Sequence, residues 1–166
     1  MTHNKPNDVS LAGQGNSAKS TVEQADGQRE LLNLVTQETR FVLIQNIMAH
    51  PEGMPSLKEL VYANPSKSKS TIRNHLDKLI EAGIVKTVEL PKDERRRDLP
   101  YRFYQITSFG QSFLEKYDLL RAEETLREMH LMLEKTPQIQ KYVDAPRPEE
   151  FQDDAQNGDS RHPIEQ

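Results

Sequence analysis

Hydroxyl and cationic side chains alternate in the sequence SKSKSTIRNH, which covers residues 66–75. The N-terminus of a helix presents free backbone N–H groups and a partial positive charge, and both suit a phosphate. If a helix begins here, short hydroxyl groups and lysine ammonium groups surround its N-terminus and add to its attraction for an anion. These groups belong to Ser66, Lys67, Ser68, Lys69, Ser70 and Thr71.

Arg73 and Asn74 follow one helical turn later. Arginine can form paired hydrogen bonds with guanine O6 and N7, and asparagine can do the same with adenine N6 and N7. We therefore predict that this helix reads DNA bases in the major groove. The predicted base contacts are Lys69, Ser70, Arg73 and Asn74, and the predicted phosphate contacts are Ser68 and Thr71. The alternative is an ordinary capped amphipathic helix with a solvated polar face.

The flanking residues predict the elements that position this stretch. An apolar face made of Ile72, Leu76, Leu79 and Ile80 predicts a helix over about residues 68–82, and Gly83 stands where a C-terminal cap is expected. Upstream, Ser56 is expected to cap a short helix that breaks at Asn64, because the residue before a proline avoids the helical region. His75 borders the apolar face, so its position fits either packing or a phosphate contact.

Two strands are predicted after this helix, in IVKTVEL (84–90) and YRFYQI (101–106), and together they form a hairpin. The loop between them, PKDERRRDLP, holds the densest basic run of the chain. Arginine at such a tip is favoured by the negative potential of a minor groove. The predicted contacts of this loop are Lys92, Arg95, Arg96 and Arg97. The alternative is a solubilising loop in which the neighbouring acids pair with these cations.

Charge is distributed unevenly along the 166 residues, whose formal net charge is −4. Residues 56–104 contain 11 Lys and Arg against 7 Asp and Glu, whereas residues 143–166 contain 2 against 7. A basic region suggests a polyanionic partner even when the whole chain is acidic. Residues 1–27 and the acidic residues 143–166 are poor in apolar side chains, so both are predicted to be disordered tails.

The remaining residues are predicted to form a DNA-binding domain (28–106) and C-terminal helices (107–142). In the DNA-binding domain, Thr36 is expected to cap a helix that ends before Pro51. In the C-terminal region, Thr107 is expected to cap a helix, and a further helical run is expected to end at Pro137. Apolar residues in the C-terminal helices recur at spacings of three and four, as in a heptad. The predicted homodimer interface is Leu119, Ala122, Leu126, Met129 and Leu133.

Two stretches, ETRFVLIQNIMAHPEGMPSLKELVYANPSKSKSTIRNHLDKLIEAGIVKTVELP and RDLPYRFYQITSFGQSFLE, resemble archaeal winged helix-turn-helix transcriptional regulators of the ArsR and PadR type. The resemblance implies a mainly α fold with a small β-hairpin, a winged helix-turn-helix followed by a C-terminal dimerisation helix. It also implies a homodimeric, sequence-specific regulator that binds double-stranded DNA. The alternative is a winged-helix module for protein–protein interaction, but such a module tends to expose apolar residues on its recognition helix.

Other chemistry has little support in the sequence. The chain has no cysteine, so it cannot form a disulfide or a thiolate metal site. For a metal, His130 with Glu123 or Glu134 is the only pairing near helical spacing. A phosphate-cradling GxxxxGK motif and a recognisable catalytic set are both missing. We expect no enzymatic activity, cofactor or bound metal, and no apolar run approaches the length of a membrane span, so a cytoplasmic protein is expected.

Overall fold

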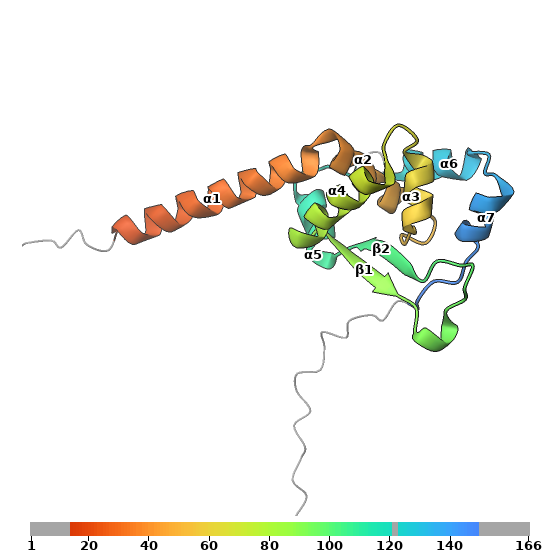
Figure 1. The fold of residues 1–166 in the computed structure, drawn as a ribbon. Coiled ribbons are helices and arrows are strands. Elements are labelled where there is room, and N and C mark those ends of the chain that lie inside the picture. Colours follow the sequence, from red (N-terminus) through yellow and green to blue (C-terminus); the bar gives the residue numbers. More distant parts are fainter. Residues whose placement is uncertain (1–13, 121–122, 150–166) are drawn as a thin grey trace, which may run out of the picture.

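The computed structural model describes residues 14–120 and 123–149, and Figure 1 shows their arrangement. A long N-terminal helix leads into a compact body of shorter helices and one antiparallel hairpin. The elements are α1 (Gln14–Thr36), α2 (Glu38–Ala49), α3 (Leu57–Ala63), α4 (Lys69–Glu81), β1 (Val85–Glu89), η2 (Lys92–Glu94), β2 (Arg102–Ile106), α5 (Ser108–Lys116), α6 (Glu123–Met132) and α7 (Pro137–Val143). The predicted fold class, mainly α with a winged helix-turn-helix, is confirmed.

The helix-turn-helix consists of α3 and α4, which pack on α2. Ser56 caps α3 as predicted, and it forms a full capping box with Glu59: the Ser56 hydroxyl accepts from the Glu59 amide, while Glu59 Oε2 accepts from the Ser56 amide at 2.6 Å. In α4 the apolar face is buried as predicted, with Ile72, Leu76 and Leu79 fully covered. Gly83 ends that helix with a φ of 76°, a conformation that glycine adopts without steric cost.

The hairpin pairs β1 with β2 in a register that runs from Val85 opposite Ile106 to Glu89 opposite Arg102. Alternation along β2 predicts that one face is covered and the other open, but Phe103 and Tyr104 are both buried. Phe103 packs with Met54 and Leu90 in a small second cluster, whereas Tyr104 joins the main core. The hairpin is therefore covered on both faces at this point, which fixes its position relative to α4.

The N-terminal boundary differs from the one expected. Residues 14–27, predicted to belong to a disordered tail, form the first part of α1, which projects away from the body in Figure 1. Residues 1–13 lie outside the described part of the chain. The cap of α2 also differs: the Gln37 side chain accepts from the Arg40 amide at 3.0 Å, while the Thr36 hydroxyl donates to the Leu32 carbonyl within α1.

The C-terminal region is not one heptad helix. Thr107 caps α5 as predicted, but α5 ends at Lys116, Asp118 adopts a φ of 56°, and Leu119 packs against the main core. The helical run expected to reach Pro137 ends at Met132 in α6, and Pro137 instead begins α7. A proline fits the first turn of a helix because its missing N–H has no helical partner there.

Candidate nucleic-acid interface

The N-terminus of α4 is organised by the predicted hydroxyl cluster. Ser68 is the N-cap: its Oγ accepts a hydrogen bond from the Thr71 amide at 3.1 Å. The same Oγ lies 2.8 Å from Thr71 Oγ1 and 3.0 Å from Ser70 Oγ. Three hydroxyl groups therefore form one exposed cluster at the positive end of the α4 dipole.

The four predicted base contacts all lie on the open side of α4. Their side chains are exposed, whereas Ile72, Leu76 and Leu79 on the other side of the helix are covered by the core. These four residues are Lys69, Ser70, Arg73 and Asn74. The structure thus leaves a polar, cationic surface uncovered along the first two turns of a helix whose apolar face is locked in place.

His75 is a packing residue in this structure. It is half-buried, and its Nδ1 lies 3.3 Å from Nη1 of Arg40 on α2. Burial and the nearby charge of Arg40 hold the pKa of His75 below its ordinary value. His75, which borders the apolar face of α4, therefore joins α4 to α2.

The predicted contacts of the wing fall into two groups. Arg95 is engaged within the loop: its Nε donates to the Leu90 carbonyl at 2.9 Å, its Nη2 lies 3.0 Å from Glu89 Oε2, and its guanidinium stacks on the Tyr101 ring at 4.2 Å. Lys92, Arg96 and Arg97 are exposed. Arg95 thus shapes the loop that presents the other cations, and its carboxylate partner comes from β1 and not from the neighbouring acids.

Glu89 also holds Arg102, at the other end of the same ion-pair group. Arg102 Nε donates to Glu89 Oε1 at 2.7 Å. This hydrogen bond is the largest of the influences that hold the pKa of Glu89 below its ordinary value. One carboxylate therefore aligns two arginines at the base of the wing.

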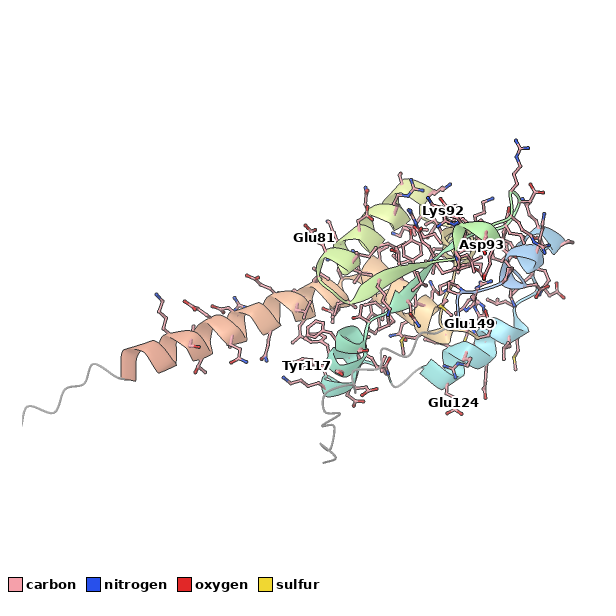
Figure 2. The ribbon with its side chains drawn as sticks, turned by 90° about the horizontal axis from the view of Figure 1, so that it is seen from below. Glu81, Lys92, Asp93, Tyr117, Glu124 and Glu149 are labelled. Atoms are coloured by element: carbon pink, nitrogen blue, oxygen red, sulfur yellow. The ribbon has the colours of Figure 1, made fainter. Side chains whose placement is uncertain are left out.

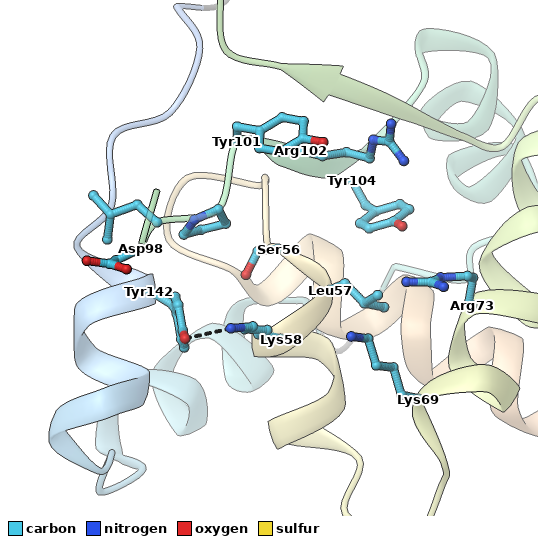
Figure 3. Close-up of a pocket in the computed structure, with 12 residues that line it drawn as sticks. Ser56, Leu57, Lys58, Lys69, Arg73, Asp98, Tyr101, Arg102, Tyr104 and Tyr142 are labelled. Carbon is cyan, nitrogen blue, oxygen red and sulfur yellow. Dashed lines mark hydrogen bonds between the residues drawn. The ribbon is translucent and has the colours of Figure 1, made fainter. Parts of the chain in front are cut away.

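A hollow lies between α3, α4, the base of the wing and α7, with a volume of about 260 Å³ (Figure 3). Its cationic lining residues are Lys58, Lys69, Arg73 and Arg102, and Asp98 is its acidic one. In Figure 3, Lys69 and Arg73 extend from α4 toward Tyr104 on β2. Lys69 and Arg73, two of the predicted base contacts, thus form one wall of this hollow, which we call the basic groove. The sequence did not indicate its other walls.

Lys58 and Tyr142 are the groove residues that sequence reasoning missed. Lys58 Nζ donates to the Tyr142 hydroxyl at 2.7 Å and lies 4.4 Å from the centre of the same ring. The hydrogen bond from Lys58 is the chief cause that lowers the pKa of Tyr142 below its ordinary value. Because 84 residues separate the pair, no local pattern in the sequence marks it.

The segment after α7 is anchored beneath α3 by a buried ion pair. Arg147 binds Glu59, and both side chains are at least 95% covered. His50 completes the cluster, with its Nε2 3.0 Å from Glu59 Oε1. Its Nδ1 accepts from the Glu52 amide, so its Nε2 carries a proton and donates to Glu59. Residues 143–149, expected in a disordered tail, are therefore packed; residues 150–166 lie outside the described part.

Comparison with known proteins adds one finding. No family model matches the sequence, and no curated protein matches it. A solved structure from Halomicrobium mukohataei, described as a protein with a GntR superfamily winged-helix-turn-helix domain, is similar, with a TM-score of 0.66 and 25% identity over 87% of this chain and 90% of that one. The winged helix-turn-helix is thus shown by the chain's own elements and by this likeness.

Two further observations concern residues 14–120 and 123–149. None of their helices is long and apolar enough to cross a membrane. They also contain no group of three or more His, Asp or Glu side chains placed to hold a metal ion.

Proposed function

We propose that the protein is a sequence-specific, DNA-binding transcription regulator. The observation that carries this proposal is the exposed polar face of α4, where Lys69, Ser70, Arg73 and Asn74 surround a capped helix N-terminus. Arginine and asparagine at this place match the donor and acceptor pattern of base edges in a major groove. The fold likeness to a winged helix-turn-helix protein supports the same reading.

In this proposal α4 enters the major groove and the wing lies on the backbone or in the minor groove. Ser68 and Thr71 contact phosphates close to the end of α4, where their hydroxyl cluster is exposed. Lys92, Arg96 and Arg97 provide the outer contacts, while Arg95 keeps the loop in shape. The ArsR- and PadR-like character indicated by the sequence belongs to the same proposal.

We further propose that the regulator is a homodimer that pairs through α6 and Leu133, which directly follows it. Met129 and Leu133 are 57% and 58% exposed, and Leu126 is partly exposed beside them. Large apolar side chains on an open surface are typical of an interface. Of the other two predicted interface residues, Leu119 packs in its own core and Ala122 lies outside the described residues. A two-fold pair would place its recognition helices about 34–36 Å apart, in successive major grooves.

Fluorescence anisotropy with a random-sequence duplex at two salt concentrations tests the DNA proposal. We expect binding at low salt that weakens as salt rises, because phosphate contacts release counterions. A protein that does not bind at low salt would contradict the proposal. That result would favour the alternative function, a winged-helix module that contacts another protein.

A further inference from the structure

The groove beside α4 concentrates positive charge on three separate elements. Lys58 comes from α3, Lys69 and Arg73 from α4, and Arg102 from β2. Arg102 is paired with Glu89, and Asp98 is the acidic residue of the lining. A concave surface that gathers like charges focuses a positive potential, so it attracts an anion of the size of the hollow.

The position of Lys58 in this groove is fixed by a tyrosine, whereas Arg102 is held by the carboxylate of Glu89. The Tyr142 hydroxyl accepts a hydrogen bond from Lys58 Nζ at 2.7 Å. The same nitrogen lies 4.4 Å from the centre of the Tyr142 ring, in a cation–π contact. An ammonium group has three N–H donors, so the bond to Tyr142 leaves donors for a ligand. Figure 3 shows this pair on the α3 and α7 side of the hollow, with Lys69 and Arg73 beyond it.

Tyr142 is itself held from behind. It is buried, and its backbone carbonyl accepts from Nη1 of Arg147 at 2.9 Å. The same arginine binds Glu59, which lies next to Lys58 in α3. The Lys58 ammonium group is thus held through Tyr142 and Arg147, and Arg147 is in turn bound to Glu59 in the same helix as Lys58. Because Lys58 is already ordered, it loses little conformational freedom when it binds a ligand.

We propose that this groove binds a phosphate group, that Lys58 is its principal ligand, and that Tyr142 is the residue that positions Lys58. The inference rests on the proposed function in one respect: the expected source of the phosphate is the DNA backbone beside the bases that α4 contacts. A phosphate free in solution has the same chemistry, so the test includes both sources.

The first experiment measures duplex affinity against salt for the wild type and for Lys58→Met. Loss of one phosphate contact is expected to lower the slope of log K against log salt by about 1 and to weaken binding to all sequences alike. Lys116→Met is the matched control, because Lys116 ends α5 beside Tyr117, far from the wing residues Lys92 and Asp93 in Figure 2. If Lys58→Met keeps the slope of the wild type and of this control, the DNA backbone is excluded as the source of the phosphate.

The second variant, Tyr142→Phe, separates positioning from charge. It keeps the ring that lies 4.4 Å from Lys58 Nζ but removes the hydroxyl that accepts from Lys58. We expect several-fold weaker DNA binding with an unchanged salt slope, because the Lys58 charge remains. Circular dichroism melts verify that both variants are folded. An affinity equal to that of the wild type contradicts the positioning role.

The third measurement does not depend on DNA binding. Pyrophosphate is titrated into the wild type and Lys58→Met, and the NMR signals of the Tyr142 ring are followed. Saturable shifts in the wild type that Lys58→Met abolishes support the groove as a phosphate site. If they occur without any duplex binding, the source is a free phosphate and the proposed function fails while the inference stands. The absence of both shifts and a Lys58-dependent salt slope overturns the inference.

Discussion

Arg147 binds both carboxylate oxygens of Glu59, with its Nη2 2.9 Å from Oε1 and 2.7 Å from Oε2, although 88 residues separate the two in the chain. The guanidinium also donates to the carbonyls of Met54, Tyr142, Val143 and Ala145. A buried ion pair offsets its desolvation only when its remaining donors are satisfied. Here they are, and the pair joins the segment after α7 to the first helix of the helix-turn-helix.

Arg147→Met is expected to lower the free energy of unfolding by about 3–5 kcal/mol, because it leaves the Glu59 carboxylate buried without its cation. Urea denaturation followed by circular dichroism measures this change. The control is Arg29→Met on α1, whose pair with Asp26 is exposed and 3.7 Å long. That change should cost less than about 1 kcal/mol. Equal effects of the two substitutions would show that the Arg147 contact contributes little.

Glu59 should also make stability depend on acid. Burial raises its pKa, but hydrogen bonds from His50 and Ser56 and the charge of Arg147 outweigh burial and hold the pKa below the ordinary 4.5. The unfolded chain therefore takes up this proton first as pH falls. The stabilisation is complete above pH 4.5 and is lost as pH drops through the folded-state pKa. Unfolding free energies measured from about pH 6 to 3 should show this loss.

Glu59→Gln provides the comparison for the acid effect. It removes the titrating group, so its stability is lower at neutral pH but should fall less steeply between about pH 5 and 3. Glu81→Gln is the matched control, because Glu81 is an exposed carboxylate at the end of α4. If the unfolding free energy falls equally steeply with acid in Glu59→Gln and in the wild type, Glu59 is not the origin of the acid dependence.

Gly110 is expected to tolerate no side chain. A Cβ at this position would lie 2.4 Å from the Ile84 carbonyl oxygen and 3.1 Å from the Ile84 Cα, and both are backbone atoms. Gly110→Ala should therefore lower stability by about 1–3 kcal/mol through the shift it forces between α5 and β1. Gly27→Ala on α1 meets open space and should raise helix content in circular dichroism instead. If Gly110→Ala leaves the stability unchanged, α5 can shift away from Ile84 without cost.

Met129→Glu is expected to convert the proposed dimer into a monomer with much weaker binding to a palindromic site, because a charge on an apolar interface is not compensated. Size-exclusion chromatography with light scattering measures the mass. Leu131→Glu is the control, because residues two apart on a helix do not share a face, and Leu131 is 63% exposed. A dimer that survives Met129→Glu places the interface elsewhere.

Arg73→Ala should weaken specific DNA binding by about 1–3 kcal/mol and relax the preference at one base position. Sites selected from a random duplex pool by the wild type provide the probe, and anisotropy gives the affinities. Lys78→Ala, in the last turn of the same helix, serves as the control for charge alone. Loss of affinity without loss of base preference would place Arg73 on a phosphate.

The sequence predicted what depends on neighbouring residues. Ser56 and Thr107 cap helices as predicted, because a hydroxyl at the start of an apolar helical pattern accepts from the free amide three residues on. Gly83 ends α4 for an equally local reason, since its φ is positive. The exposed face of α4 followed from the spacing of its apolar residues.

Contacts between distant segments were not predictable in the same way. The heptad spacing indicated one helix, but α5 ends at Lys116 and Leu119 packs against the main core. Lys58 with Tyr142 and Glu59 with Arg147 pair across more than 80 residues, so no periodicity marks them. The sequence does not distinguish Arg95 from Arg96 and Arg97, because only the fold places Glu89 and Tyr101 beside Arg95.

The Arg147 contact also has a consequence for synthesis on the ribosome. Chains emerge from the N-terminus, so all residues of α3, α4 and the hairpin are made before the partners of Lys58 and Glu59 exist. A nascent chain therefore carries α4 while Lys58 lacks its tyrosine until residue 142 is made and Glu59 lacks its arginine until residue 147 is made. The proposed phosphate groove is thus complete only after residue 147 has been made, and its affinity for phosphate is expected to rise at that point.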